Sequence, residues 1–142
     1  MEVSATLLKG AQFAVNARGH QVICDQPVDN GGEDAGMTPP EFLLASLATC
    51  AGYYAAQYLK TRGLSTEGLS VKVIAEKATH PARLGSFRID VSVPPVDERH
   101  HLGLQRAVKS CIVHNTLLAA PSIEVALTTL EPAALQWEVG TR

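Results

Sequence analysis

The spacing of hydrophobic and polar residues in the first quarter of the chain predicts β-structure. Residues 3–8, 12–16 and 21–24 are short apolar or alternating runs of strand length. Residues 17–20, Ala-Arg-Gly-His, separate the second run from the third and predict a hairpin turn. Residues 25–36 contain Pro, Asn, Asp and several glycines and predict a loop, which has no lysine and therefore lacks a phosphate-binding pattern.

The next segment predicts the longest helix of the chain. Thr38 is a suitable N-cap, Pro39 suits the first helical position, and Glu41 stands where a capping box places its carboxylate. Apolar residues then recur until Gly63, which is suited to end the helix. Because the alanine and leucine face is broad, we expect this helix to be buried on most sides.

Two further strands and a second helix are expected after this helix. Residues 69–75 and 87–93 predict strands; the second alternates apolar and polar positions and ends at a Pro-Pro pair. Asp97 is suited to cap a helical pattern that ends before Pro121. This pattern includes Cys111, although Cys111 can also stand at a break in it.

Residues 123–130 and 136–139 predict closing strands. The order of elements is then strands, helix, strands, helix, strands, which predicts an α+β fold with a mainly antiparallel sheet. A length of 142 residues is typical of one domain, so we expect residues 1–142 to form a single domain.

Composition excludes several classes of function. With 46% hydrophobic and 18% charged residues, the chain is globular rather than disordered. The net charge of -2 gives no basic stripe for nucleic acid, and no apolar run is long enough to cross a membrane. The first residues lack a signal-peptide pattern, so we expect a cytoplasmic protein, in which a disulfide is more often catalytic or transient than structural.

Two of the three cysteines lie in the two helical patterns. If the helices pack together, Cys50 and Cys111 can cycle between dithiol and disulfide. Each can equally be a small buried hydrophobe, because free cysteine is among the most buried residue types. Cys24 lies in a strand pattern beside Ile23, and we interpret it as a core residue.

The residues around these two cysteines carry a family resemblance. Residues 38–50, Thr-Pro-Pro-Glu-Phe-Leu-Leu-Ala-Ser-Leu-Ala-Thr-Cys, resemble the first cysteine helix of the OsmC/Ohr family, the osmotically induced protein C and organic hydroperoxide resistance proteins. Residues 110–117, Ser-Cys-Ile-Val-His-Asn-Thr-Leu, resemble its second cysteine motif, and the loop 29–36 also fits. The resemblance implies an intertwined homodimer, with mainly antiparallel sheets wrapped around two long central helices.

The resemblance also implies a thiol-dependent peroxidase that reduces organic and also inorganic hydroperoxides without a cofactor or a metal. Cys50 would be the peroxidatic cysteine, whose thiolate attacks the O–O bond and becomes a sulfenic acid. Cys111 would be the resolving cysteine, which condenses with Cys50 to a disulfide. An external dithiol, typically on a lipoylated protein in this family, would reduce the pair.

The sequence departs from the family pattern at its activating residues. The family's catalytic glutamate directly follows the helix-starting proline, where this chain has Pro40, and Glu41 comes one residue later. A shift of one position turns a helical side chain by about 100°, so capping of the helix is the simpler role for Glu41. The family's arginine comes from the N-terminal strands, where Arg18 is the candidate, and Ile112 replaces the proline that usually follows the second cysteine.

Two further observations leave alternatives open. His114 follows Cys111 at a C-x-x-H spacing, which is half of a zinc site without a second ligand pair; orienting a thiol or a carbonyl is the simpler role. Tyr53, Tyr54 and Tyr58 can line an apolar pocket or pack in the core. The rival functions are a non-enzymatic protein that binds a small apolar ligand or a partner, and a thiol redox sensor.

Overall fold

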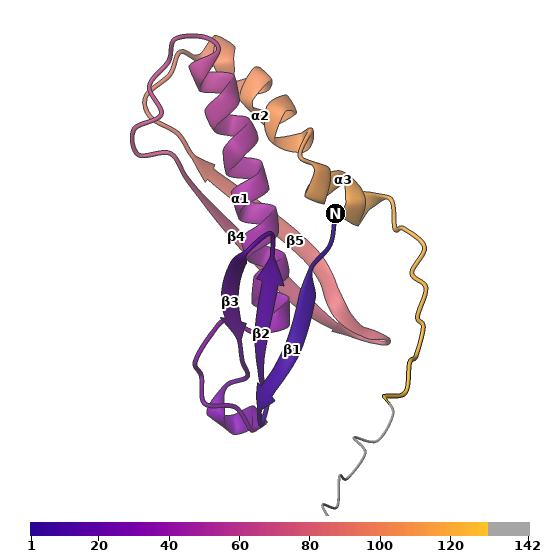
Figure 1. Cartoon of the computed structure of the whole chain (residues 1–142). Coiled ribbons are helices and arrows are strands. Elements are labelled where there is room, and N and C mark those ends of the chain that lie inside the picture. Colours follow the sequence, from indigo (N-terminus) through magenta and orange to yellow (C-terminus); the bar gives the residue numbers. More distant parts are fainter. Residues whose placement is uncertain (131–142) are drawn as a thin grey trace, which may run out of the picture.

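The computed structural model describes residues 1–130, which form two antiparallel sheets and three α-helices (Figure 1). A three-stranded sheet has the order β1-β2-β3, and a hairpin of β4 and β5 forms the second sheet. The α+β fold predicted from the order of elements is therefore correct. The strands are β1 (Ser4–Lys9), β2 (Gln12–Ala17), β3 (His20–Cys24), β4 (Ser70–Thr79) and β5 (Ala82–Ser92), and the α-helices are α1 (Pro39–Lys60), α2 (His101–Lys109) and α3 (Ile112–Leu118).

The predicted hairpin between β2 and β3 is present, with Ala17 paired to His20 across the turn. Arg18 has a φ of 51° and Gly19 a φ of 81°. Positive φ at both central residues is the geometry of the two-residue turn that matches the twist of paired strands. The turn therefore presents Arg18 as an exposed residue at the tip of the hairpin.

Helix α1 begins as its sequence predicts. The backbone N–H and the hydroxyl of Thr38 both donate to Oε2 of Glu41, at 2.7 Å and 2.8 Å. These bonds hold the Glu41 carboxylate against the first turn and lower its pKa. The helix ends before Gly63, which has a φ of 67°.

Helix α1 packs mainly on α2 and β4, with fewer contacts to α3 and β5. Its fully buried residues follow one stripe at a spacing of four: Leu47, Ala51, Ala55 and Leu59. The expectation that α1 is buried on most sides is therefore wrong within this chain, since Tyr53 on another face is 60% exposed. The described strands β1 to β3 pack chiefly on one another.

The second helical pattern is divided into separate helices. Asp97 caps a short 3₁₀ turn, Glu98–His100, by accepting from the N–H of Arg99, and α2 follows directly. The chain then leaves helical geometry at Cys111, whose ψ is 130°, and resumes as α3. Cys111 thus stands at a break, the alternative that the sequence left open.

The closing strand expected at residues 123–130 is absent from the structure. This segment has no regular structure, and its apolar residues Ile123, Val125 and Leu127 are 84–95% exposed. In Figure 1 the chain after α3 runs away from the body of the molecule. The strand expected at residues 136–139 lies outside the described residues. Within residues 1–130, the structure has no helix that is long and apolar enough to cross a membrane.

The loop between β3 and α1 is organised by one buried carboxylate, that of Asp25, which is 1% exposed. It accepts hydrogen bonds from the backbone N–H groups of Gln26, Glu33 and Ala35 at 2.8–3.1 Å, and from the side-chain amide of Gln12 at 3.4 Å. The Ala35 bond is the largest of the effects that lower the pKa of Asp25. Glycine at position 32 leaves the space for this packing, since a Cβ there would collide with the Gln26 carbonyl.

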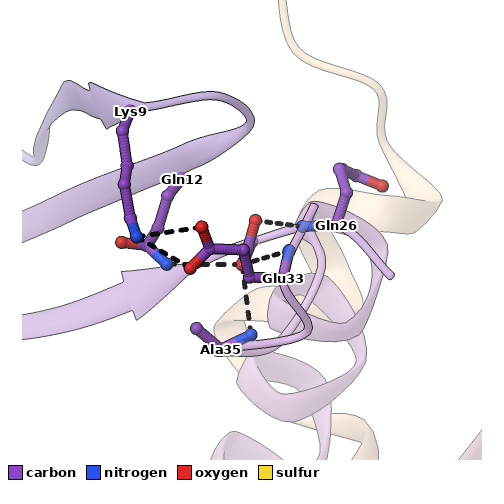
Figure 2. A network of polar contacts seen from close by, with 6 residues as sticks. Lys9, Gln12, Gln26, Glu33 and Ala35 are labelled. Atoms are coloured by element: carbon purple, nitrogen blue, oxygen red, sulfur yellow. Dashed lines mark hydrogen bonds and ion pairs between the residues drawn. The ribbon is translucent and has the colours of Figure 1, made fainter. Parts of the chain in front are cut away.

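The same loop carries a surface ion pair, in which Nζ of Lys9 lies 2.8 Å from the Glu33 carboxylate (Figure 2). Glu33 is therefore an exposed carboxylate that is paired with Lys9. Both side chains are well exposed, so the pair itself contributes little to stability. Together with the Asp25 bonds, it fixes the loop to the turn between β1 and β2.

Candidate active site

The two helix cysteines approach each other where α1 packs against the break between α2 and α3. Cys111 is completely buried, and Cys50 is half-buried. Both are free thiols, and the neighbouring Cys50 thiol adds to the effect of burial in raising the pKa of Cys111. The two thiols expected to form a pair are therefore neighbours in the folded chain.

The position of Cys111 follows from the break in the helix. Ser110 ends α2 with its hydroxyl donating to the Arg106 carbonyl at 3.0 Å, and Cys111 then caps α3. The N–H of His114 donates to Sγ of Cys111 at 3.5 Å. Burial and the contact with Cys50 raise the pKa of the Cys111 thiol and outweigh the backbone N–H groups of His114 and Val113, which lower it. Cys111 is therefore held as a neutral thiol at neutral pH.

An apolar groove of about 910 Å³ lies beside the thiol pair, between β5 and the helices α2 and α3. This volume is within the range of about 300–1,000 Å³ that small-molecule sites have. Leu47, one helical turn before Cys50, lines the groove, as do Val108 and His114 on either side of Cys111. The apolar side chains of β5 that line it are Leu84, Phe87, Ile89, Val91 and Val93. Neither cysteine itself lines the groove, so a small apolar molecule there would contact their sequence neighbours Leu47, Val108 and His114.

Within residues 1–130, neither of the two candidate activating residues forms a hydrogen bond with a thiol. Glu41 is in the first turn of α1, nine residues before Cys50, which is roughly 13 Å along the helix axis. Its carboxylate is bound to Thr38. Arg18 is exposed on the hairpin tip, and within residues 1–130 no hydrogen bond joins it to either cysteine.

The other residues considered as site candidates make packing contacts away from the groove. Cys24 is buried at the end of β3, as expected for a core residue. The Tyr58 hydroxyl lies 3.3 Å from Nδ1 of His100, and the ring is covered by the Arg62 guanidinium at 3.7 Å, so Tyr58 packs between helices and does not line the groove. Among residues 1–130, no group of three or more His, Cys, Asp and Glu side chains could hold a metal ion.

Sequence reasoning missed the central role of Asp25 and the polar edge of the groove. Asp25 directly follows a strand and precedes a glycine-rich loop, a position where an aspartate commonly accepts from nearby backbone N–H groups, so a local signal was present. The residues at the polar edge of the groove, His101, Lys109 and His114, come from two helices, and no local pattern unites them.

Comparisons with known proteins agree with this architecture. The family model described as OsmC-like protein matches residues 31–126. A Psychrobacter arcticus 273-4 protein of the osmotic stress and detoxification response shares 20% identity at a TM-score of 0.74, covering 80% of this chain and 85% of its own. The OsmC-like protein of Mycoplasma pneumoniae shares 20% identity at a TM-score of 0.67, covering 84% and 87%.

A third solved structure is an organic hydroperoxide resistance protein, OsmC, from Legionella pneumophila. It shares 17% identity at a TM-score of 0.57, covering 82% of this chain and 89% of its own. Identities this low establish the shared fold alone. No curated protein sequence matches the chain. The family model spans about two thirds of the sequence, including both cysteines, so the chain belongs to the family of OsmC-like proteins.

Proposed function

We propose that this protein is a thiol-dependent peroxidase that reduces organic hydroperoxides through a dithiol–disulfide cycle of Cys50 and Cys111. The observation that carries the proposal is the contact between these two free thiols at the side of an apolar groove. Family membership supports a peroxide-related role, since solved relatives include organic hydroperoxide resistance proteins. An apolar groove favours hydroperoxides with a hydrocarbon body.

The different burial of the two thiols suggests that they act in different steps of the reaction. Cys50 is the more accessible of the two, so it is the thiol that meets the hydroperoxide. Its thiolate attacks the terminal oxygen, the O–O bond breaks, and Cys50 becomes a sulfenic acid while the alcohol departs. The Cys111 sulfur then displaces the sulfenic hydroxyl, which leaves as water, and an external dithiol reduces the resulting disulfide.

The environment of Cys111 suits the resolving step. Burial keeps its thiol neutral and away from bulk oxidant, so Cys111 is a poor first target for peroxide. Once Cys50 carries a sulfenic acid, the Cys111 sulfur is already beside it. Its position at a helix break gives the backbone some freedom to bring the two sulfurs within bonding distance.

The proposal is tested with stoichiometric cumene hydroperoxide and peptide mass spectrometry. We expect a Cys50–Cys111 disulfide in the wild type and a trapped Cys50 sulfenic acid in Cys111→Ser. Cys50→Ser should abolish turnover with a dithiol such as dihydrolipoate, while Cys24→Ser, which removes the third cysteine, should retain it. Persistence of both free thiols after peroxide treatment would refute the cycle.

The main rival is a binding protein for a small apolar ligand, which the size and lining of the groove also favour. In that case Cys50→Ser would bind an apolar fluorescent probe as well as the wild type does, and peroxide turnover would remain at background. A thiol sensor would instead form the disulfide without efficient turnover by dithiols. The same set of variants therefore separates the three functions.

We also propose that the active protein is a homodimer. β1 is exposed along its whole length, and its Leu7 and Leu8 are more than half exposed. A sheet that packs chiefly on itself and exposes apolar residues is typical of a surface covered by a partner. Light scattering should give twice the 15.1 kDa mass of the chain, and a monomeric mass at working concentration would contradict the proposal.

A further inference from the structure

Cleavage of the O–O bond of an alkyl hydroperoxide releases an alkoxide, which is a strong base and a poor leaving group. A proton donor positioned at the departing oxygen therefore accelerates the step, typically by about 10²–10⁴-fold. Cys50 and Cys111 supply the attacking and the resolving sulfur, but neither supplies this proton. The family's usual acid position holds Pro40, and Glu41 is bound into the helix cap.

The groove itself contains three titratable side chains: His101, Lys109 and His114. His101 begins α2, roughly 12 Å along the helix axis from its end, and so lies away from the break that holds Cys111. Lys109 is exposed at the last residue of α2. His114 lies within the second cysteine motif, is half-buried, and has an imidazole, which can both give and accept a proton near neutral pH.

His114 is tied to the thiol pair by its own backbone. Its N–H donates to Sγ of Cys111 at 3.5 Å, which places the residue within the turn that holds the resolving sulfur. Its side chain lines the groove together with Leu47, which lies one turn before Cys50 on α1. His114 thus borders the same groove as Leu47, the groove residue of α1 that lies one turn before Cys50.

The hydrogen-bond partner of the ring leaves one nitrogen free for proton transfer. Nδ1 of His114 lies 3.4 Å from Oδ1 of Asn115. An amide oxygen can only accept, so Nδ1 carries the hydrogen of this contact. Nε2 is then the nitrogen that gives or takes a proton.

Resting on the peroxidase function proposed above, we propose that His114 is the general acid that protonates the departing alkoxide when Cys50 attacks the hydroperoxide. The Cys50 thiolate forms an S–O bond with the terminal oxygen, the O–O bond breaks, and the imidazolium proton converts the alkoxide to the alcohol. Cys50 is oxidised to sulfenic acid and the peroxide is reduced. When a dithiol later reduces the disulfide, the proton that Cys50 loses on returning to thiolate restores the imidazolium.

The leaving group provides the test. Peracetic acid releases acetate, a weak base that needs no proton, whereas tert-butyl hydroperoxide releases a strongly basic alkoxide. In the Cys111→Ser background, His114→Gln should slow oxidation of Cys50 by tert-butyl hydroperoxide by about 100-fold. Oxidation by peracetic acid should change little, and added imidazole should restore part of the lost rate.

The matched control is His80→Gln, which changes an exposed histidine in the turn between β4 and β5 and should leave both rates unchanged. Equal loss with both oxidants, or no loss with either, would overturn the role of His114. If Cys111→Ser alone reacts with neither oxidant above background, the peroxidase function itself fails. Equal thermal melting of the variants establishes that folding is not the cause of a lost rate.

Discussion

The Asp25 carboxylate connects residue chemistry to the geometry of the loop that leads into α1. Three backbone N–H groups and one side-chain amide donate to it, and they outweigh the effect of burial, so its pKa lies below the ordinary range. Protonation removes the charge that these donors stabilise. Asp25 therefore stabilises the fold only while it is ionised.

Dependence on the ionised Asp25 carboxylate makes the fold less stable as the pH falls. A carboxylate with a lowered folded-state pKa contributes stability above its unfolded value of about 3.9, and this contribution is lost as the pH falls through the folded-state pKa. Asp25→Asn should lower Tm at neutral pH and flatten the fall of Tm below about pH 4. Asp29→Asn, at an exposed carboxylate of the same loop, is the matched control. Thermal melts of Asp25→Asn that match the wild type across this pH range would contradict the role of Asp25.

Among the elements, those defined by local chemistry could be predicted from the sequence. The start of α1 depends on Thr38, Pro39 and Glu41, which are neighbours in the chain, and the β2–β3 turn depends on Arg18 and Gly19. The break between α2 and α3 has no glycine or proline to mark it, so periodicity alone favoured one continuous helix. Residues 123–130 have strand-like alternation but no partner strand within the described chain. Pairing is a tertiary property that a local pattern does not contain.

The candidate site also has parts that the sequence predicts and parts that only tertiary packing creates. The resemblance of two motifs identified Cys50 and Cys111, and packing of α1 on α3 brings them together. The groove is assembled from residues as far apart as Leu47 and Leu118, so no single segment predicts it. Glu41 fits the capping box but stands one residue after the family's glutamate position, and the structure assigns its carboxylate to the helix cap.

The contact between α1 and α2 depends on a glycine. A Cβ at position 103 would collide with the ring and hydroxyl of Tyr58, which is held by His100 and Arg62. Overpacking costs about 1–3 kcal/mol, which exceeds or matches the gain of up to about 1 kcal/mol from replacing a helical glycine with alanine. Gly103→Ala should therefore lower the free energy of unfolding by about 0–2 kcal/mol.

Gly52 in α1 provides the control for this contact. A Cβ there would lie 3.4 Å from Cγ2 of Val71, which is close to an ordinary contact. Gly52→Ala should therefore be neutral or raise stability by up to about 1 kcal/mol through helix propensity. Urea denaturation of both variants gives the comparison. A Gly103→Ala variant more stable than Gly52→Ala would show that Tyr58 moves aside without cost.

At the scale of the whole molecule, the proposed redox cycle forms and breaks a covalent crosslink within the chain. A Cys50–Cys111 disulfide would close a loop of about 60 residues that contains β4, β5 and α2. In the chain-entropy account, a loop of this length stabilises the folded state by about 4 kcal/mol, less any strain in forming the bond. The oxidised protein should therefore melt well above the reduced protein, by roughly 10 °C for a domain of this size.

This difference can be measured by calorimetry on the wild type before and after one equivalent of cumene hydroperoxide, with Cys111→Ser as the control that should show no gain. Non-reducing electrophoresis determines whether the bond lies within one chain. Crosslinked pairs of chains would place the resolving sulfur on a second copy instead. An unchanged Tm, together with an intrachain bond, would mean that strain at the helix break cancels the entropic gain. Because dithiols reduce strained disulfides more readily, that strain would also favour turnover.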